Sequence, residues 1–231
     1  GINVDGGMAD FLKTGARAVV ELDPIIKPRD VAALADAGLT AYHAVKKATP
    51  LLYPGTFAVV IGAGGLGHIG IQSLKCLTSA TIIVVDRSEG ALQVAKESGA
   101  DITVLADGKH IQKIKDITNG FGCEVVLDFV GEGSAIADGI AMLRRAGSYF
   151  VIGYGGTIDV PAIDLISSEI NFVGNLVGTY NDLAELMTLT AQGKVKLHTK
   201  TYALEDFNQA MDDLHHGHLH GRGILLPAHA R

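Results

Sequence analysis

Short apolar segments recur along the middle of the chain, and stretches whose apolar residues repeat at helical spacing separate them. Segments such as TIIVVD and EVVLDFV are apolar almost throughout, which is typical of strands covered on both faces of a sheet. Alternation of such strands with helices predicts an α/β fold with a doubly wound parallel sheet. The expected strands span residues 58–62, 80–86, 102–105, 124–129, 147–152 and 170–177.

Helical patterns account for most of the remaining chain. Asp30 is expected to cap an Ala-rich helix over residues 31–48, which carries Gly38 in its interior. Residues 6–23 have a short, strand-like pattern, and the chain after about residue 178 returns to strand, helix and strand. Further helices are expected over residues 66–77, 89–98, 110–118, 134–144 and 181–192.

Composition narrows the class of protein. The chain has 231 residues, of which 48% are hydrophobic, so it can bury a sizeable core. Its net charge of -6 and the absence of any block of Lys or Arg argue against a nucleic-acid partner. No apolar run reaches the roughly 18 residues of a membrane span and no basic-then-apolar leader opens the chain, so we expect a cytoplasmic protein. Only two cysteines occur, Cys76 and Cys123, which excludes a disulfide framework.

The most informative motif is AVVIGAGGLGHIGIQ, in which glycines interrupt an apolar strand and open a helix. In such a unit Gly62 permits a tight turn, Gly64 lets the backbone approach a pyrophosphate, and Gly67 lets the helix pack closely on the strand. The N-terminus of the helix then stabilises the anion. Asp86 ends the next strand roughly 20 residues later, which is the context that a dinucleotide site requires. The alternative is a glycine-rich turn that holds no ligand.

Asp86 also bears on which dinucleotide would bind. Its carboxylate can accept hydrogen bonds from the ribose hydroxyls of adenosine and would repel a 2′-phosphate, which favours NAD over NADP. Arg87 follows it, and an Arg at that place can instead pair with the extra phosphate. NAD is the expected cofactor.

Five motifs follow one another at family-like spacings along nearly the whole chain: ALADAGLTAYHAV, AVVIGAGGLGHIGIQ, VVLDFVG, GSYFVIGYGG and GHLHGRGILLP. In these motifs the chain resembles the medium-chain zinc-dependent alcohol dehydrogenases, most closely the NAD-dependent secondary alcohol dehydrogenase type. The resemblance implies oxidation of alcohols to ketones or aldehydes, and the reverse, by hydride transfer with NAD at a zinc site in the complete enzyme. Small-molecule alcohols and ketones are the implied substrates.

The family places a GroES-like catalytic module, bearing a Cys and a His-Glu pair at the zinc, before the region matched here. None of those motifs occurs in this chain, which begins without Met in the manner of a cut edge. By resemblance, residues 1–30 are a remnant of that β-rich module, residues 31–178 the Rossmann NAD-binding domain, and residues 179–231 a segment returning to the module. The chain alone is expected to bind NAD but to turn over little or no alcohol.

The resemblance assigns a metal ligand and a catalytic position to one helix. Asp36 falls where the family places the third protein ligand of the catalytic zinc, and a carboxylate is a sound zinc ligand. Thr40 lies one helical turn further along on the same face, where it would hold the nicotinamide ring. The residues alone leave alternatives open: Asp36 as a solvated side chain, and Thr40 as a residue that packs its methyl group within the helix contact.

The resemblance also assigns cofactor contacts beyond the glycine turn. Strand-end backbone at residues 152–154 would bond the carboxamide, and residues 129–130 would flank the adenosine side. Arg222 would pair with the pyrophosphate, unless it is an exposed surface side chain. The full set expected to contact the cofactor is Gly62, Gly64, Gly65, Leu66, Gly67, Asp86, Arg87, Phe129, Val130, Ile152, Gly153, Tyr154 and Arg222.

The tail contains the run HHGHLH, whose four histidines could coordinate a metal. The favoured interpretation is the C-terminal end of a helix that stops at Gly217, where partial positive charge opposes the helix dipole. The histidines are His215, His216, His218 and His220.

Two other functions and an association between copies of the chain are also consistent with the sequence. A zinc-independent quinone or enal reductase would share the fold, but Asp36 at the zinc-ligand position disfavours it. A free-standing NAD-binding or NAD-sensing module would have no chemistry of its own. The apolar segment INFVGNLVG, residues 170–178, lies at the expected edge of the sheet and predicts a homodimer or homotetramer, because an unprotected edge strand tends to find a partner.

Overall fold

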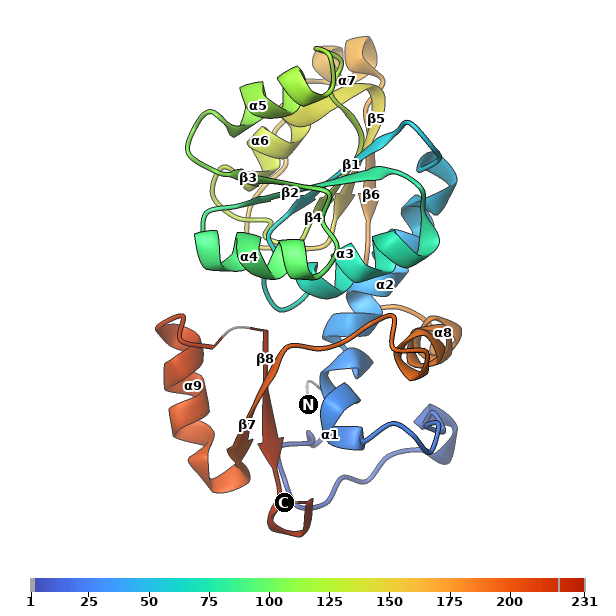
Figure 1. The fold of residues 1–231 in the computed structure, drawn as a ribbon, viewed down its shortest axis with the longest axis vertical. Coiled ribbons are helices and arrows are strands. Elements are labelled where there is room, and N and C mark those ends of the chain that lie inside the picture. Colours follow the sequence, from blue (N-terminus) through green and yellow to red (C-terminus); the bar gives the residue numbers. More distant parts are fainter. Residues whose placement is uncertain (1–2, 220, 231) are drawn as a thin grey trace.

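The computed structural model describes residues 3–219 and 221–230. Within these residues, six parallel strands form a sheet in the order β3-β2-β1-β4-β5-β6 (Figure 1). The order reverses direction between β1 and β4, as in doubly wound Rossmann folds, so the predicted fold class is confirmed. The strands are β1 (Phe57–Ile61), β2 (Thr81–Asp86), β3 (Ile102–Leu105), β4 (Cys123–Asp128), β5 (Leu143–Val151) and β6 (Asn171–Gly174).

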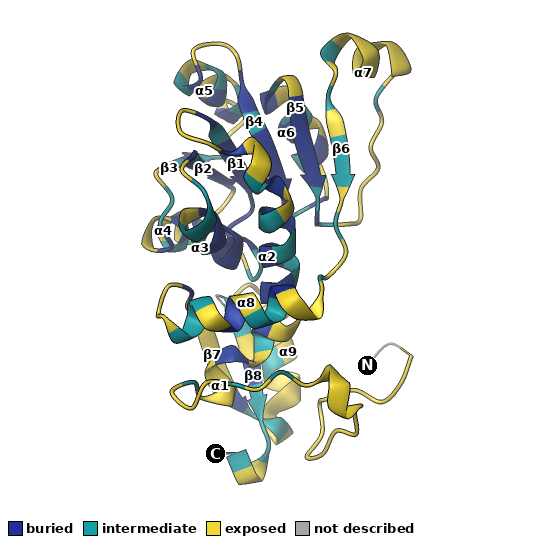
Figure 2. Ribbon diagram, turned by 90° about the vertical axis from the view of Figure 1, so that its right-hand side faces the viewer, coloured by how far each residue is buried: buried dark blue, intermediate teal, exposed yellow. Residues whose placement is uncertain are grey.

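Helices cover both faces of this sheet, whose strands are largely buried (Figure 2). Successive strand residues point to opposite faces. In β1, Ala58 and Val60 belong to a core shared with α2, α3 and α4, whereas Val59 and Ile61 belong to a core shared with α5 and α6. Each fully buried aliphatic side chain of this kind contributes about 1.5–3 kcal/mol. None of the helices in the described ranges is long and apolar enough to cross a membrane. The helices are α1 (Pro28–Val31), α2 (Ala37–Ala48), α3 (Gly67–Leu77), α4 (Glu89–Glu97), α5 (His110–Ile117), α6 (Ala135–Met142), α7 (Ala162–Ser168), α8 (Tyr180–Ala191) and α9 (Phe207–His215).

A smaller part of the chain lies below the sheet in Figure 1 and contains α1, α8, α9 and two further strands. The strands β7 (Thr199–Ala203) and β8 (Arg222–Leu226) pair in parallel, with α9 between them in the sequence. A third apolar cluster, which includes Leu34, Ile69 and Val195, joins this part to α2 and α3. The predicted return to strand, helix and strand near the end of the chain is therefore confirmed. Short 3-10 turns span Ala16–Ala18, Ala32–Ala35, Thr49–Leu51, Leu204–Asp206 and Ala228–Ala230.

The prediction of strand-like structure for residues 6–23 is wrong. The structure describes no strand between residues 3 and 56, and residues 6–23 hold only one 3-10 turn in a mostly exposed course (Figure 2). Phe11, for example, is 87% exposed. A strand is stable only when a neighbouring strand pairs with its backbone, and none of the described residues does so here.

The single helix predicted for residues 31–48 was also wrong. The helical course starts earlier, with Pro28 at the first position of α1, and Asp30 lies inside α1 rather than at its cap. It then breaks at Asp36, whose backbone leaves the helical region, before α2 begins. Tertiary packing accompanies the break, because a Cβ on Gly38 would lie 2.4 Å from Leu34 Cδ2 and 3.0 Å from Leu186 Cδ2 on α8.

The last two strands of the sheet differ from their predicted bounds. The helix expected to end at residue 144 stops at Met142, and β5 starts at once with Leu143, which pairs with Cys123. β6 ends at Gly174, earlier than expected, and the Asn175 side chain bonds to backbone at its end. The Asn175 Nδ2 donates to the carbonyl oxygens of Val151 (3.1 Å) and Val173 (2.8 Å).

Candidate functional site

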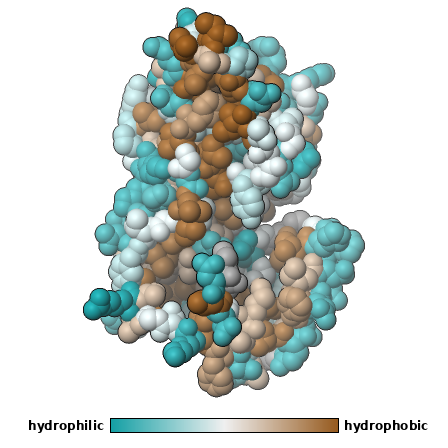
Figure 3. All heavy atoms as spheres, turned by 180° about the vertical axis from the view of Figure 1, so that it is seen from behind, coloured by the Kyte–Doolittle hydropathy of each residue, from teal (hydrophilic) through white to brown (hydrophobic). Residues whose placement is uncertain are grey.

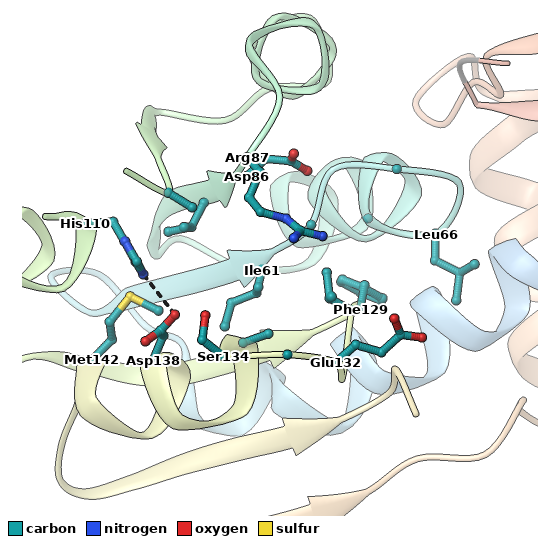
Figure 4. Close-up of a pocket in the computed structure, with 18 of the residues that line it drawn as sticks. Ile61, Leu66, Asp86, Arg87, His110, Phe129, Glu132, Ser134, Asp138 and Met142 are labelled. Carbon is teal, nitrogen blue, oxygen red and sulfur yellow. Dashed lines mark ion pairs between the residues drawn. The ribbon is translucent and has the colours of Figure 1, made fainter. Parts of the chain in front are cut away.

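A cavity of about 700 Å³ opens at the carboxyl ends of β1, β2 and β4 (Figure 4). This is the point where the strand order reverses, and ligands of open α/β sheets bind there. The cavity is lined by ten of the residues that the sequence marked as cofactor contacts: Gly62, Gly64, Gly65, Leu66, Gly67, Asp86, Arg87, Phe129, Val130 and Arg222.

The glycine turn between β1 and α3 forms one wall of this cavity. Gly62 has a φ of +86°, a conformation that strongly favours glycine, and its N–H donates to the Val85 carbonyl at 2.9 Å. A Cβ on Gly67 would lie 1.8 Å from the Gly62 carbonyl oxygen, so only glycine lets α3 start this close to β1. A Cβ on Gly64 would meet nothing within 4 Å, so this glycine borders open space.

Asp86 joins the glycine turn to the end of β2. Its Oδ2 accepts a hydrogen bond from Ala63 N and its Oδ1 accepts one from Ser88 N, both at 2.8 Å. A carboxylate has about four acceptor positions, so Asp86 keeps acceptor capacity after these two bonds. Arg87 is exposed, and Figure 4 shows it beside Asp86 at the same corner of the cavity.

The loop after β4 forms the opposite wall. Val130 Cγ2 lies 2.6 Å from the place a Cβ on Gly62 would occupy, and the Phe129 ring packs on Gly70 of α3. The buried Asp128 holds this loop, because its Oδ1 accepts from Val130 N (2.8 Å) and from Gly131 N (2.9 Å). The Tyr149 hydroxyl of β5 donates to the other carboxylate oxygen of Asp128. Burial, followed by the bond to Asp128, raises the pKa of Tyr149 well above its usual value.

Arg222 reaches the glycine turn from the other part of the chain. It begins β8, and its Cδ and Nη1 lie 3.0 and 3.1 Å from the place a Cβ on Gly65 would occupy. A guanidinium therefore stands beside the N-terminus of α3, where the helix dipole also favours a negative charge. The arrangement offers backbone N–H groups and a fixed cation to one anionic group.

Comparison with known proteins identifies the family of this chain. The family described as zinc-binding dehydrogenase matches residues 65–192. An NAD-dependent alcohol dehydrogenase of Sulfurisphaera tokodaii is 36% identical over 231 residues, which cover 98% of this chain and 66% of that protein. The chain belongs to the zinc-binding dehydrogenase family. It spans 66% of the length of these curated relatives, which include an NAD-dependent alcohol dehydrogenase of Saccharolobus solfataricus at 35% identity over 98% of this chain.

Solved structures agree with that membership. The alcohol dehydrogenase from Aeropyrum pernix superimposes with a TM-score of 0.94 at 42% identity, over 98% of this chain and 67% of that one. An acetophenone reductase from Geotrichum candidum, solved in complex with NAD, superimposes with a TM-score of 0.76 at 25% identity, over 89% of this chain and 58% of that one. The predicted resemblance is thereby confirmed.

The structure does not bring every predicted site residue to the cavity. Residues 152–154 lie outside its lining, and the Tyr154 side chain is 89% exposed. The N–H groups of Ile152 and Gly153 both donate to the Asp128 carbonyl, at 3.1 and 2.8 Å. Their carbonyl oxygens are the groups that could accept from a carboxamide.

Asp36 and Thr40 also lie outside the lining of the cavity. Asp36 is exposed at the break before α2, and the Thr40 hydroxyl turns back on its own helix to donate to the Asp36 carbonyl at 2.8 Å. In the part of the chain that the structure describes, no group of three His, Cys, Asp or Glu side chains could hold a metal. Asp36 therefore lacks the further ligands that zinc requires, and the described residues do not by themselves fit a zinc ion.

The far end of the cavity contains residues that sequence reasoning missed. His110 of α5 and Asp138 of α6 face each other, with 3.3 Å between Nε2 and Oδ2 (Figure 4). Met142 and Ser134 lie beside this pair, whereas Glu132 lines the cavity nearer Phe129 (Figure 4). His110 and Asp138 form no sequence motif, because they are far apart in the chain and come together only where α5 and α6 pack side by side on the sheet. Asp128, which holds the loop after β4, was missed for the same reason.

The histidine-rich tail agrees with a helix end. α9 stops at His215, Gly217 has a φ of +71°, and His216 Nδ1 lies 3.0 Å from the Asp212 carbonyl. His216 also stacks near His218, with 5.9 Å between ring centroids. His220 lies outside the described residues.

A polar cluster fastens α8 to α2. Lys46 Nζ lies 3.0 Å from Asp182 Oδ1 and 2.7 Å from Glu185 Oε2, and His43 Nδ1 lies 2.9 Å from Asp182 Oδ2. Bonds to Glu185 and Asp182 raise the pKa of Lys46. Burial acts to raise the pKa of Asp182, but hydrogen bonds from Thr179, Lys46 and His43 outweigh it and hold that pKa below its usual range. The cluster joins α8 to α2, the helix that carries Thr40 and begins directly after Asp36.

Proposed function

We propose that this chain is the cofactor-binding part of an NAD-dependent alcohol dehydrogenase that interconverts small alcohols with ketones or aldehydes. One observation carries the proposal: the cavity at the switch point is bounded by a glycine turn, a carboxylate and a guanidinium, at Gly62–Gly67, Asp86 and Arg222. The curated relatives act as NAD-dependent alcohol dehydrogenases, and their names support the same activity for the complete protein.

Each part of the cavity has a role toward NAD. The pyrophosphate binds at the N-terminus of α3, where backbone N–H groups and Arg222 supply positive charge. The adenosine ribose bonds to the free acceptor positions of Asp86, which disfavours a 2′-phosphate and hence NADP. Phe129 and Val130 exclude water from the adenosine side, and the backbone carbonyls of residues 152–154 hold the carboxamide. When bound, NAD supplies the chemistry of hydride transfer.

The zinc ligand and the catalytic position belong to the complete protein. Asp36, at the break before α2, would supply one carboxylate to the metal, and Thr40 of α2 would position the nicotinamide ring. Because Asp36 has no partner ligands among the described residues, we expect the 231-residue chain to bind NAD without appreciable alcohol oxidation.

Calorimetric titration of the 231-residue chain with NAD and NADP tests the proposal. NAD should bind more tightly than NADP. Gly64→Ala should fold normally, since its Cβ meets no atom, yet lose at least about tenfold in NAD affinity because the methyl group occupies the space of the pyrophosphate. Gly15→Ala is the matched control, because its Cβ also meets nothing within 4 Å and it lies far from the cavity in the sequence. A wild-type chain that binds no NAD, or Gly64→Ala with unchanged affinity, would overturn the proposal.

An NAD-binding module without catalysis is the second candidate, and the lack of further ligands around Asp36 favours it. The intact mass of the protein from its natural source separates the two. A mass of 24.1 kDa, equal to that of this chain, supports the module. A mass of about 35–40 kDa, the size of a two-domain protein, supports the dehydrogenase.

We also propose that two copies associate through residues 170–178. Among the described strands, β6 pairs only with β5, so its other edge has no strand partner. Leu176 is 86% exposed, and hydrophobic side chains gather on the face shown in Figure 3. Exposed edge strands of this kind pair readily with a second chain. Sedimentation velocity at micromolar concentration should show a dimer or tetramer, and a monomer would contradict the proposal.

A further inference from the structure

The chain after α8 lies along α3, the helix that begins at the glycine turn. Gln72 contacts this segment with both ends of its side-chain amide. Its Nε2 donates to the Lys196 carbonyl at 2.9 Å, and its Oε1 accepts from Lys196 N at 2.8 Å. The amide of Gln72 thus pairs with the backbone of residue 196 much as a neighbouring strand would.

His68 makes the next contact toward the glycine turn. The N–H of His198 points to His68 Nε2 at 3.4 Å, and His68 Nδ1 lies 2.8 Å from the Gly64 carbonyl. Since a backbone N–H can only donate, Nε2 is the acceptor, and Nδ1 carries the proton that bonds Gly64. Burial lowers the pKa of His68, which favours this neutral form. One imidazole therefore links the glycine turn to the segment before β7.

The contacts made by His68 and Gln72 have the same spacing on α3 as on the docked segment. His68 and Gln72 are four residues apart on α3 and project from one face, which corresponds to a rise of about 6.0 Å. Their partners, His198 and Lys196, are two residues apart in an extended segment, which corresponds to about 6.6 Å. The same spacing continues by one more step: Cys76, four residues after Gln72, has its Sγ 4.0 Å from the carbonyl of Lys194, two residues before Lys196. An extended segment therefore fits this helix face in one antiparallel register.

This register determines where Arg222 begins its strand. The His198 carbonyl, on the residue whose N–H meets His68, accepts from Arg222 N at 2.8 Å. Thr199 then pairs with Arg222 as the first step of the β7–β8 sheet. The Arg222 side chain lies against Gly65, so the position of its guanidinium follows from the docking of residues 194–198 on α3.

We propose that Gln72, together with His68, is a positioning residue for cofactor binding, which acts by docking residues 194–198 so that Arg222 is held over the glycine turn. The inference rests on the proposed NAD function of the cavity. Gln72 does not line that cavity, so its effect on NAD must pass through the docked segment.

The experiment is a double-mutant cycle in the 231-residue chain, with NAD affinity measured by calorimetry at several salt concentrations. Gln72→Ala should weaken NAD binding by about three- to tenfold, the size expected when one well-made hydrogen-bonded contact is lost. It should also reduce the salt dependence of binding, as Arg222→Ala does, because a cation is no longer held at the pyrophosphate. In the Arg222→Ala background, Gln72→Ala should have no further effect on NAD affinity.

Gln93→Ala is the matched control: among the described residues, the Gln93 side chain bonds only to Glu97 on its own helix, so the change should leave both readouts at the wild-type value. Hydrogen exchange without NAD adds an independent readout. In Gln72→Ala, the amides of Lys196 and Arg222 should exchange faster than in the wild type.

Two results overturn the positioning role while leaving the proposed function intact. One is a Gln72→Ala chain that binds NAD as the wild type does, and the other is an equal loss of affinity with and without the Arg222 side chain. A wild-type chain that binds no NAD instead overturns the proposed function and the positioning role with it.

Discussion

The glycine turn after β1 and the segment around Asp36 differ in how completely the described residues surround them. The turn is closed by Asp86, Val130 and Arg222, each in contact with one of its glycines or neighbours. Asp36 is exposed, and among the described residues its carboxylate belongs to no group of three side chains that could hold a metal. Among the described residues, the proposed cofactor site therefore has its glycine turn, carboxylate and guanidinium together, whereas the proposed metal site has Asp36 as a single candidate ligand.

The largest expected effect comes from Gly67→Ala. Its Cβ would lie 1.8 Å from the Gly62 carbonyl, so α3 must move away from β1. We expect the free energy of unfolding to fall by about 3 kcal/mol and NAD binding to be lost, as measured by urea unfolding and calorimetry. Gly15→Ala should change neither. A fully stable Gly67→Ala would show that the turn is less tightly packed than its geometry indicates.

Asp128→Ala tests the loop that covers the glycine turn. The change leaves the buried Tyr149 hydroxyl and the N–H groups of Val130 and Gly131 without their acceptor. The free energy of unfolding should fall by about 2–3 kcal/mol, with weaker NAD binding because Val130 is no longer fixed. Tyr149→Phe removes only one of these bonds and should cost about 1 kcal/mol. Equal effects of the two variants would contradict a loop held mainly by Asp128.

Acid should weaken the part of the site that contains His68. Burial lowers the pKa of His68, so below about pH 6.5 the unfolded chain binds a proton that the folded chain resists. The contribution of neutral His68 to the free energy of unfolding is therefore fully present above that pH. It is lost as the pH falls through the pKa of His68 in the folded chain. Melting temperatures between pH 7.5 and 5.5 should decrease for the wild type and for His215→Ala, whose histidine is exposed. His68→Gln should show a smaller decrease, and an unchanged slope in that variant would count against the buried neutral imidazole.

The smallest effect is expected at Asp36. Its described bonds use only the backbone carbonyl, so Asp36→Asn should change the free energy of unfolding by less than about 0.5 kcal/mol. NAD affinity of the 231-residue chain should also stay unchanged. In the complete protein, the same change should reduce zinc content, measured by metal analysis. A strong loss of stability in the isolated chain would show that the Asp36 carboxylate has a structural partner.

Some features could be predicted from short stretches of sequence and others could not. The strands and the glycine turn were predictable because continuous runs of apolar residues and the spacing of glycines are local features of the sequence. The break at Asp36 was not, because Gly38 meets Leu186 of α8, and no local signal announces that contact. The strand pattern of residues 6–23 misled for a related reason: a sequence can favour extended backbone without supplying the neighbour that a strand needs.

The doubly wound sheet, the glycine turn and the acidic residue at the end of β2 could all be inferred from the sequence, since each follows from the local order of apolar, small and charged residues. Three contacts became visible in the folded chain: Arg222 lies over Gly65, Asp128 bonds Tyr149, and residues 194–198 dock on α3. These contacts join residues far apart in the chain, so they depend on how the layers pack. This packing places residues from distant parts of the chain around the glycine turn and so forms the cavity.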